Sequence, residues 1–571
     1  MAETNLGPKA PKDPTKKRNH FYIMRNKPVS ASPSEDGKGV CFIYEDDGRM
    51  VSAARLVGGI EDEEELKLLE TTEGFRKLVH SVGVSVETSE NIDSVRFVLQ
   101  MYGKEDIYGG GTNIIADVPT NGVEVVIDLD QIEWRSDDNV PGQIRFEFEK
   151  SGPVADVSVC FYLNDGFDAP EVEEESSVDF DSKEYDLMID NAIMQQGNNY
   201  RIKKALEKAR RGEETTLAFI GGSVTQGAGA VPINTQCYAR KIYEGFCQLA
   251  GVDYDKNVKY IKAGVGGTPS ELGMLRYKRD IVDESIPDLV VIEFAVNDAG
   301  DETGGECYDS LVRKAYNGPG NPAVVLLFGV FADDFNLQDR LSPVGLAYNL
   351  PMVSTKNSVT EQFYKKATEG RIVTKNQFFY DRYHPSNIGH KIMADGVIRM
   401  LKNADMAELD EEVDIKSITP PIGGDFENVY RIDRKENEVG AVIDCGSFAA
   451  IDKETQYVER NMDVFGTLQF VDNWMHPENG KDDVKPFTMD VKCKSILLIY
   501  KDSGENKVGK ADVYVDGKKT YYVDPRVIGW THCNAVIIHR GEESSEHHVE
   551  VHMASGSEDK EFTILGFGVV L

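Results

Sequence analysis

The 571-residue sequence has no run of eighteen apolar residues, and its acidic residues far outnumber its basic ones. The first absence argues against a membrane-spanning helix, and no apolar stretch follows the basic N-terminal segment as it would in an export signal. We therefore expect a cytoplasmic protein, or a secreted one if a signal has been removed. With 63 Lys and Arg against 97 Asp and Glu, the formal charge of −34 repels nucleic-acid phosphates and anionic membrane surfaces. Neither nucleic acid nor a membrane is an expected partner.

Cysteine is scarce and scattered, and the histidines form no metal-binding motif. The eight cysteines include no C-x-x-C pair, so we expect free thiols in a reducing compartment rather than a disulfide framework. No H-E-x-x-H and no His/Cys group with zinc spacing occurs. The one dense group, His547, His548 and His552, lies in an alternating strand-like run, where an exposed face is a simpler explanation than a metal site. We expect no metal and no other cofactor.

The sequence changes character twice along its length, which predicts three domains. Residues 1–180 contain an irregular arm, short strands with alternating polarity (as over 144–149) and an acidic linker, which predict an antiparallel β-sandwich. Residues 181–410 alternate continuous apolar strands with helices, which predicts a parallel sheet covered on both faces, an α/β three-layer domain. Alternating strands return over 411–571, where Asp516-Gly517 predicts a tight hairpin turn. This last domain is expected to be a second, jelly-roll-like β-sandwich.

Ser223 is the first candidate for chemistry, in the segment TTLAFIGGSVTQGAGA that begins at Thr215. An apolar strand ends at two glycines, Gly221 and Gly222, which permit a sharp strand-to-helix turn and leave the next hydroxyl at the edge of the sheet. Such a serine could equally cap a helix or belong to a phosphate-binding turn. Neither G-x-G-x-x-G nor G-x-x-x-x-G-K-[ST] fits the segment, however.

A serine nucleophile needs a base, and the segment DRYHPSNIGH offers His384 with Asp381 three residues before it. On a tight turn this spacing lets the carboxylate bind one imidazole nitrogen while the other nitrogen faces the serine. Taken alone, the pair could also be an ordinary turn aspartate and a histidine next to a helix.

Acyl transfer also needs hydrogen-bond donors for the oxyanion. The turn in IKAGVGGTP offers the main-chain N–H of Gly267, and EFAVND offers the side-chain amide of Asn297. The N–H of Ser223 would be the third donor. The alternatives are a plain turn glycine and a cap residue at the end of a strand. Asp298 is expected to hold loops together by accepting main-chain hydrogen bonds.

In this order and at these strand ends, the four blocks resemble the SGNH, or GDSL, hydrolase superfamily over roughly residues 198–401. The resemblance implies a catalytic triad and an oxyanion hole. The triad would be Ser223, Asp381 and His384; the oxyanion hole would be Ser223, Gly267 and Asn297.

Two positions depart from the usual pattern of the superfamily. Gly222 stands where many members have Asp, and Ala295 stands where Gly is common. Neither change removes a reacting group, but the first makes a lipase-like member less probable. The text GGSVTQGAGA is most similar to bacterial carbohydrate esterases that remove acetyl groups from xylan or mannan, in which a β-sandwich often accompanies the hydrolase domain.

The resemblance therefore implies a serine esterase whose substrate is an acetylated oligosaccharide from hemicellulose. For the sugar we expect an aromatic platform at Tyr238 or at Trp474, which lies in a polar, turn-rich segment, whereas Trp530 is expected in a core. Two alternatives stay open: a lipid or acyl esterase or thioesterase of the same superfamily, and a non-catalytic carbohydrate-binding protein. The polysaccharide, the acetyl position and the oligomeric state also stay open.

Overall fold

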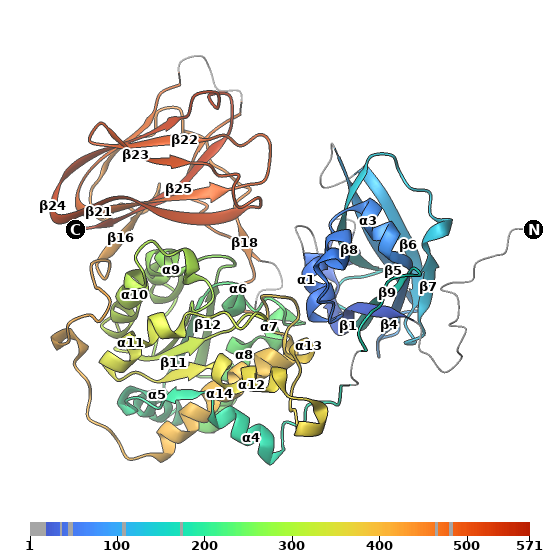
Figure 1. Ribbon diagram of the computed structural model, residues 1–571. Coiled ribbons are helices and arrows are strands. Elements are labelled where there is room, and N and C mark those ends of the chain that lie inside the picture. Colours follow the sequence, from blue (N-terminus) through green and yellow to red (C-terminus); the bar gives the residue numbers. More distant parts are fainter. Residues whose placement is uncertain are drawn as a thin grey trace, which may run out of the picture.

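The computed structural model describes residues 19–34, 37–43, 49–104, 110–171, 175–462, 466–478 and 484–571. Three regions, each built on its own strands, follow one another along the chain (Figure 1). All eight cysteines lie in the described part of the chain, and none of them forms a disulfide there. Over the same residues, none of the helices combines the length and the apolar character needed to cross a bilayer.

The N-terminal region, which contains strands β1 to β9, consists of two antiparallel sheets and three short helices. One sheet has the order β1 (His20–Ser30), β9 (Val154–Leu163), β4 (Val79–Glu87), β7 (Val125–Asp128). The other has the order β2 (Ser32–Pro33), β3 (Gly39–Ile43), β8 (Asp138–Phe148), β5 (Ser94–Gly103), β6 (Gly110–Pro119). The helices are α1 (Arg49–Leu56), α2 (Glu63–Leu68) and α3 (Thr72–Leu78). Apolar side chains from both sheets form one core, because alternate residues of each strand face inward.

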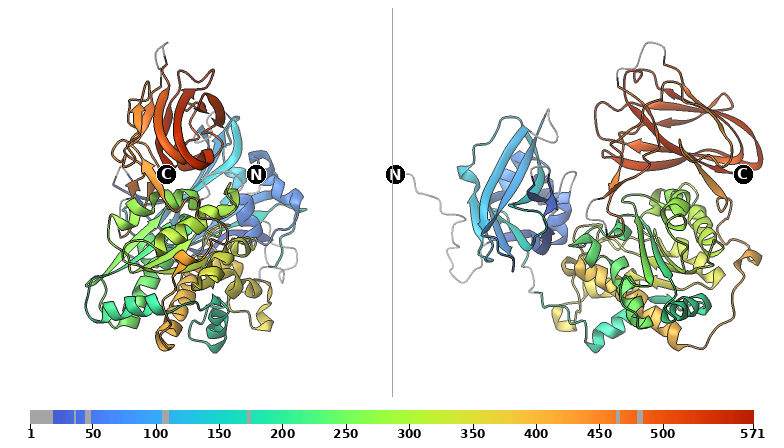
Figure 2. Two further views of the ribbon diagram at one scale, coloured as in Figure 1. Left: turned by 90° about the vertical axis from the view of Figure 1, so that its left-hand side faces the viewer. Right: turned by 180° about the vertical axis from the view of Figure 1, so that it is seen from behind.

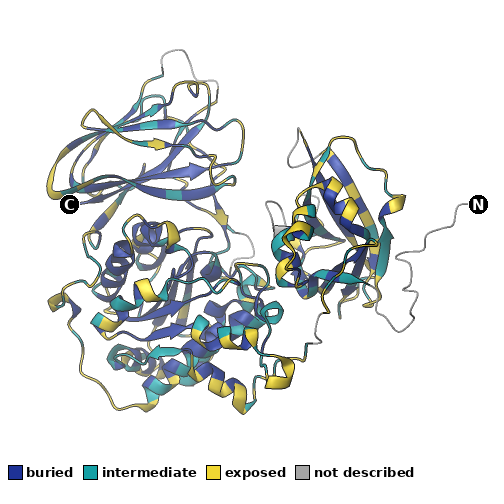
Figure 3. Ribbon diagram, viewed as in Figure 1, coloured by how far each residue is buried: buried dark blue, intermediate teal, exposed yellow. Residues whose placement is uncertain are grey.

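The middle region is a six-stranded sheet, largely parallel, with helices on both faces. Its order is β10 (Ile193–Gln195), β15 (Met352–Ser354), β14 (Ala323–Phe328), β13 (Leu289–Glu293), β11 (Thr215–Gly221), β12 (Val258–Gly264). Only β10 is antiparallel to its neighbour. All seven residues of β11 are buried, which explains its continuous apolar sequence (Figure 3). The edge strand β10 and its neighbour β15 have three residues each, too few for a periodic pattern to predict them.

The helices of the middle region divide between the two faces of its sheet. One face packs against α5 (Tyr200–Arg210), α8 (Tyr238–Ala250) and α14 (Asn387–Met406). The other packs against α9 (Ser270–Tyr277), α10 (Glu306–Tyr316) and α11 (Gln338–Tyr348). This is the three-layer arrangement that the alternation of strands and helices predicts. In such a sheet the carboxyl ends of the parallel strands share one edge, where ligand groups gather.

The C-terminal region, strands β16 to β25, differs from the expected pair of sheets. Its main strands form one sheet in the order β16 (Val429–Ile432), β25 (Phe562–Val570), β21 (Phe487–Asp502), β24 (His532–Met553), β22 (Ala511–Val515), β23 (Lys518–Val523). Strands β17 (Val442–Asp444) and β20 (Trp474–His476) pair with β21 and β25. The strands form one continuous sheet instead of two because β21 and β24 are long and the register of their pairing shifts part-way along. The predicted hairpin is present: β22 and β23 join at Asp516 and Gly517, both with positive φ.

The C-terminal sheet lies directly on the middle region (Figure 2). Successive residues of β21 point in opposite directions: Leu498 packs into the region's own core, and Leu497 and Ile499 pack with the layer that contains α9 and α10. This apolar contact fixes the C-terminal loops relative to the edge of the middle sheet.

Candidate active site

Ser223 is the first residue of α6 (Ser223–Gln226), and only Gly222 separates it from the end of β11. The two glycines before it are needed because other groups occupy the space where side chains would lie. A Cβ on Gly221 would be 2.0 Å from the Thr225 hydroxyl oxygen, and one on Gly222 would be 2.3 Å from the Asn297 side-chain oxygen. The sequence GGS therefore allows the amide of Asn297 to lie next to the serine.

His384 and Asp381 complete a continuous hydrogen-bonded chain with Ser223. The Nε2 atom of His384 lies 3.0 Å from Ser223 Oγ, and Nδ1 lies 2.8 Å from Asp381 Oδ2. Because an ionised carboxylate can only accept, this geometry places the ring proton on Nδ1 and leaves Nε2 free to take the serine proton. The side chains of Asp381 and His384 are 17% and 18% exposed, so the hydrogen-bonded residues can be reached from the surface.

The environment of Asp381 keeps it ionised. Burial raises the pKa of this carboxyl, but its interaction with His384 and two main-chain bonds outweigh burial and lower the pKa to about 2. The amides of Tyr383 and His384 donate to Asp381 Oδ1 at 2.7 and 2.8 Å. The carboxylate is thus fixed by its own loop while its second oxygen orients the imidazole.

The three expected oxyanion donors lie at the carboxyl ends of three adjacent strands, β13, β11 and β12. The N–H of Ser223 starts a helix and so has no partner within it. Gly267 lies in the turn after β12 with φ +72°, and a Cβ on the preceding Gly266 would be 3.7 Å from Ser223 Cβ. A Cβ on Gly222, the residue before Ser223, would be 2.8 Å from the Asn297 amide nitrogen. The structure therefore brings all three groups around the serine.

Side chains from two regions hold the Gly266–Gly267 turn. Gln226, one turn after Ser223, accepts the N–H of Gly266 at 3.0 Å. Gln456 of the C-terminal region donates to the Gly266 carbonyl oxygen at 2.8 Å. The first bond fixes the peptide group between Val265 and Gly266, and the second fixes the peptide group that contains the N–H of Gly267.

His532 of the C-terminal region holds the next peptide of the same turn. Its Nε2 lies 3.1 Å from the Gly267 carbonyl oxygen, and its Nδ1 lies 2.9 Å from Asp502 Oδ2. A second Asp–His pair thus supports the Gly266–Gly267 turn. No sequence motif marks either residue, because the two lie 30 positions apart on β21 and β24 and more than 200 positions from the glycine.

Trp530 lies over this turn, and its predicted place in a core is wrong. The side chain is 45% exposed, and a Cβ on Gly267 would be 2.9 Å from the indole ring. Trp530 also lines a cavity of about 840 Å³ together with Asp381 and Tyr383. The far wall of this cavity comes from α1 of the N-terminal region, including Val51. All three regions therefore contribute to the space beside the loop that carries Asp381 and His384.

The predicted sugar platforms Tyr238 and Trp474 are wrong, because both rings are buried. Tyr238 is fully buried at the start of α8, where its hydroxyl binds the Thr225 hydroxyl at 2.7 Å. Trp474 is 4% exposed and packs edge-on against Phe487 with ring centroids 5.1 Å apart. The polar residues around Trp474 belong to loops at the ends of the short strand β20, which itself faces the core.

Buried carboxyls lie behind the reacting groups. Asp298 Oδ1 accepts the N–H of Ser270 at 2.8 Å, which confirms its expected role in holding loops. Burial raises the pKa of Asp298 to about 7 and that of Glu293, at the end of β13, to about 8. These groups connect the end of β13 to the neighbouring loops.

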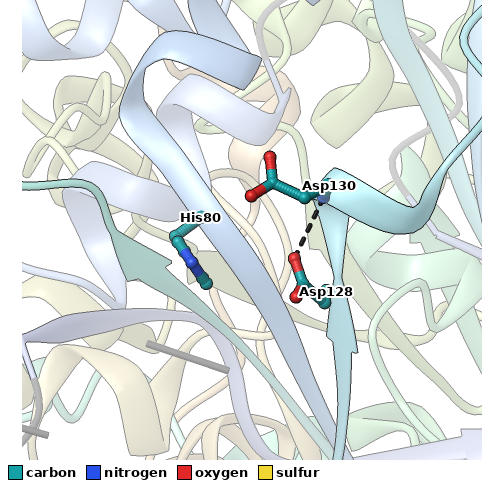
Figure 4. Close-up of side chains that lie close together, drawn as sticks. All are labelled: His80, Asp128 and Asp130. Atoms are coloured by element: carbon teal, nitrogen blue, oxygen red, sulfur yellow. Dashed lines mark hydrogen bonds between the residues drawn. The ribbon is translucent and has the colours of Figure 1, made fainter. Parts of the chain in front are cut away.

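A separate group, His80, Asp128 and Asp130, has the composition of a metal site but lies in the N-terminal region (Figure 4). One ligand atom from each residue lies within 4.8 Å of the others, and the Asp130 amide donates to Asp128 Oδ1 at 3.0 Å. His80 lies 48 positions before Asp128 in the sequence, so the spacing of the residues could not reveal this group. The three grouped histidines of β24 contact carboxylates instead: His547 contacts Asp516, His548 contacts Asp490 and Glu550, and His552 contacts Glu550.

No protein-family model matches this chain, and no curated protein matches it by sequence. Among solved structures, the chain is similar to a two-domain esterase (CEX) active on acetylated mannans, co-crystallized with mannopentaose. The identity is 27% and the TM-score 0.56, over 67% of this chain and 97% of that one. An acetyl xylan esterase from Geobacillus stearothermophilus is 20% identical over 35% of this chain and 98% of its own, with a TM-score of 0.27.

The resemblance to carbohydrate esterases that the motifs indicated is therefore confirmed by structural neighbours. These neighbours also support the prediction of a carboxylic ester hydrolase of several domains, one of them rich in β-structure. About a third of this chain has no counterpart in the two-domain esterase, since the match covers 67% of the chain.

Proposed function

We propose that this protein is a serine esterase that removes acetyl groups from oligosaccharides derived from hemicellulose, such as acetylated mannan or xylan fragments. The observation that carries the proposal is the chain of contacts from Ser223 through His384 to Asp381, with distances of 3.0 and 2.8 Å. The substrate class is supported by the 27% identical esterase, which is active on acetylated mannans.

In the first half of the reaction, His384 Nε2 takes the proton of Ser223 as Oγ attacks the carbonyl carbon of the acetyl ester. The negative charge that forms on the carbonyl oxygen is stabilised by the N–H groups of Ser223 and Gly267 and by the Asn297 amide. His384 then donates its proton to the sugar oxygen as the carbon–oxygen bond breaks. The products are a free sugar hydroxyl and an acetyl ester on Ser223.

In the second half, water replaces the sugar. His384 takes a proton from the water as its oxygen attacks the acetyl-enzyme, and the same donors bind the second oxyanion. The proton returns to Ser223 Oγ as acetate leaves. Asp381 remains ionised throughout and stabilises the imidazolium, in agreement with its pKa of about 2.

The saccharide would occupy the cavity beside this site. A volume of about 840 Å³ lies within the range of known small-ligand sites and exceeds what an acetyl group alone requires. Trp530 offers a half-exposed indole next to Gly267, on which a sugar ring can stack. Tyr383 and Arg382, which line the same cavity, offer polar groups for hydroxyls.

The test is acetate release from acetylated manno- and xylo-oligosaccharides, with wild type beside Ser223→Ala. We expect the variant to lose roughly 1,000-fold or more of kcat, because no other group supplies the nucleophile. Ser285→Ala is the matched control, since Ser285 binds the Thr216 hydroxyl at 2.9 Å at the opposite edge of the sheet. Acetate release that survives in Ser223→Ala would overturn the assignment.

Chain length of the acyl group separates the proposal from a lipid esterase. With 4-nitrophenyl acetate, butyrate and octanoate, an acetylesterase should prefer the acetate. A preference for octanoate would contradict the proposed substrate class while leaving the catalytic chain in place.

A further inference from the structure

Lys27, on β1 of the N-terminal region, extends its side chain into the middle region. It is 3% exposed, and its ammonium donates to the carbonyl oxygen of Phe379 at 2.5 Å and to that of Asn376. Both carbonyls belong to α13 (Lys375–Phe378) or the residue after it, just before Asp381. In Figure 1, β1 and α13 face each other across the boundary between the two regions.

A β-bulge lies just before Lys27, whose side chain points toward the middle region. The pairing of β1 with β9 shifts register between Met24 and Lys27, and Asn26 within the shift has φ +49°. An extra residue in a strand changes the face to which the following side chains point. The main-chain N–H of Asn26 donates to the Ser158 hydroxyl at 2.9 Å, and this bond fixes the bulge.

The carbonyl of Phe379 is at the base of the loop that carries the acid and the base. We call residues 379–385 the acid–base loop. Phe379 and Pro385 form an antiparallel bridge, and the Tyr380 amide donates to the His384 carbonyl oxygen at 2.8 Å. The loop is therefore closed at its base, and Lys27 binds that base from outside the middle region.

Two carboxylates, Glu175 and Asp381, act electrostatically on the Lys27 ammonium. Glu175, in the segment that joins the two regions, accepts the Asn376 side-chain amide at 2.8 Å and also binds the Thr374 hydroxyl. Burial lowers the pKa of Lys27 to about 8, and the charges of Glu175 and Asp381 act in the opposite direction. The catalytic carboxylate is thus one of the two counter-charges of this buried cation.

We propose that Lys27 is a positioning residue that holds the acid–base loop, so that the N-terminal region is a working part of the esterase site. The inference rests on the proposed function, since it assigns work to His384 and Asp381. Without the ammonium, two carbonyls lose a charged donor, and Glu175 and Asp381 lose a shared counter-charge. The loop would then relax away from Ser223.

The test compares Lys27→Met and Lys27→Arg with Lys314→Met in the full chain. Lys314 is the matched control because it also joins two regions, donating to the Val429 carbonyl oxygen at 2.8 Å. Burial lowers its pKa to about 8 as well. It lies on α10, near the end opposite the catalytic edge of the sheet.

With 4-nitrophenyl acetate, we expect Lys27→Met to lower kcat roughly tenfold to a hundredfold and to leave KM within about twofold. Lys27→Arg should recover most of kcat, because a guanidinium keeps the charge and the donors. Lys314→Met should match wild type. The split between kcat and KM and the recovery by arginine are effects that a general loss of stability would not produce.

Hydrogen exchange gives a readout that does not depend on activity. The amides of Tyr383 and His384 donate to Asp381, so they should exchange faster in Lys27→Met and at the wild-type rate in Lys314→Met. If Lys27→Met failed to fold, the exchange and kcat of Lys27→Gln would decide instead. Wild-type kcat together with wild-type exchange would overturn the inference. Absence of Ser223-dependent hydrolysis in wild type would refute the proposed function, while exchange would still decide the role of Lys27.

Discussion

The replacement Asp381→Asn tests the acid–base chain with little change in shape. The asparagine oxygen can keep both main-chain bonds from Tyr383 and His384, which are 2.7 and 2.8 Å long in the structure. The new NH2 group then faces His384 Nδ1, where a carboxylate oxygen lies at 2.8 Å. Since an NH2 group donates, it selects the imidazole with its proton on Nε2. That nitrogen would donate to Ser223 instead of accepting its proton.

The expected loss of kcat is roughly 1,000- to 10,000-fold, the size of effect that the wrong tautomer and the lost imidazolium partner produce together in a serine hydrolase. Initial rates with 4-nitrophenyl acetate measure it, and thermal unfolding checks that the fold is kept. Asp333→Asn is the control, because Asp333 pairs with Arg382 at 3.1 Å in a half-exposed contact beside the same loop. A surface pair of this kind contributes little, so the control should keep kcat within about twofold.

One result would refute the role assigned to Asp381. If Asp381→Asn folds as wild type and keeps more than about a tenth of kcat, the carboxylate does not set the tautomer of His384.

The pKa of Asp381 also predicts how the stability of the fold depends on pH. The folded-state pKa of about 2 lies below the ordinary value of 3.8, so the Asp381 carboxylate stabilises the fold above about pH 4. That contribution is lost as the pH falls toward 2.

Three further predictions follow from the same structure. Asn297→Ala should lower kcat roughly 100- to 1,000-fold with little change in KM, because the amide acts on the oxyanion; steady-state kinetics with the acetyl ester tests this, and a change confined to KM would contradict it. Trp530→Ala should raise KM for acetylated oligosaccharides by roughly tenfold and leave kcat for 4-nitrophenyl acetate unchanged, whereas Trp474→Ala should cost about 3 to 5 kcal/mol of unfolding free energy. An unchanged KM in the first variant would place the sugar elsewhere. Burial raises the pKa of Glu293 to about 8, so its contribution to stability falls by about 1.4 kcal/mol per pH unit as the pH rises from about 4.5 to 8. Glu293→Gln should reduce this slope in urea unfolding measured across that range, and an unchanged slope would show that Glu293 does not bind the proton.

The middle region and its reacting groups could be predicted from the sequence because their signals are local. Strands such as β11 are buried on both faces and therefore read as continuous apolar runs. Ser223, Gly267 and Asn297 each follow such a strand, and parallel strands place those ends at one edge of the sheet. The distances between them come from the architecture, so the order of the motifs was enough to expect them together.

Local polarity predicted the wrong burial for Trp474 and for Trp530. Trp474 has polar neighbours in the sequence but pairs through β20 with the central strand β25, so its ring faces the core. Trp530 has apolar neighbours but lies beyond the edge of the C-terminal sheet, against Gly267 of another region. Whether an aromatic ring is buried depends on what packs over it, and local polarity does not report that.

By itself the sequence determined the strand–helix alternation of the middle region, the serine turn, and the Asp381–His384 pair, because each depends on residues within a few positions of one another. Only the tertiary structure decided which residues of the other regions hold the site: His532 binds the Gly267 turn, and Lys27 binds the base of the acid–base loop. Lys27 lies more than 350 positions before His384, and its contact exists only where the N-terminal and middle regions meet. Such contacts follow from how surfaces dock, and docking leaves no periodic or short-range pattern in a single chain.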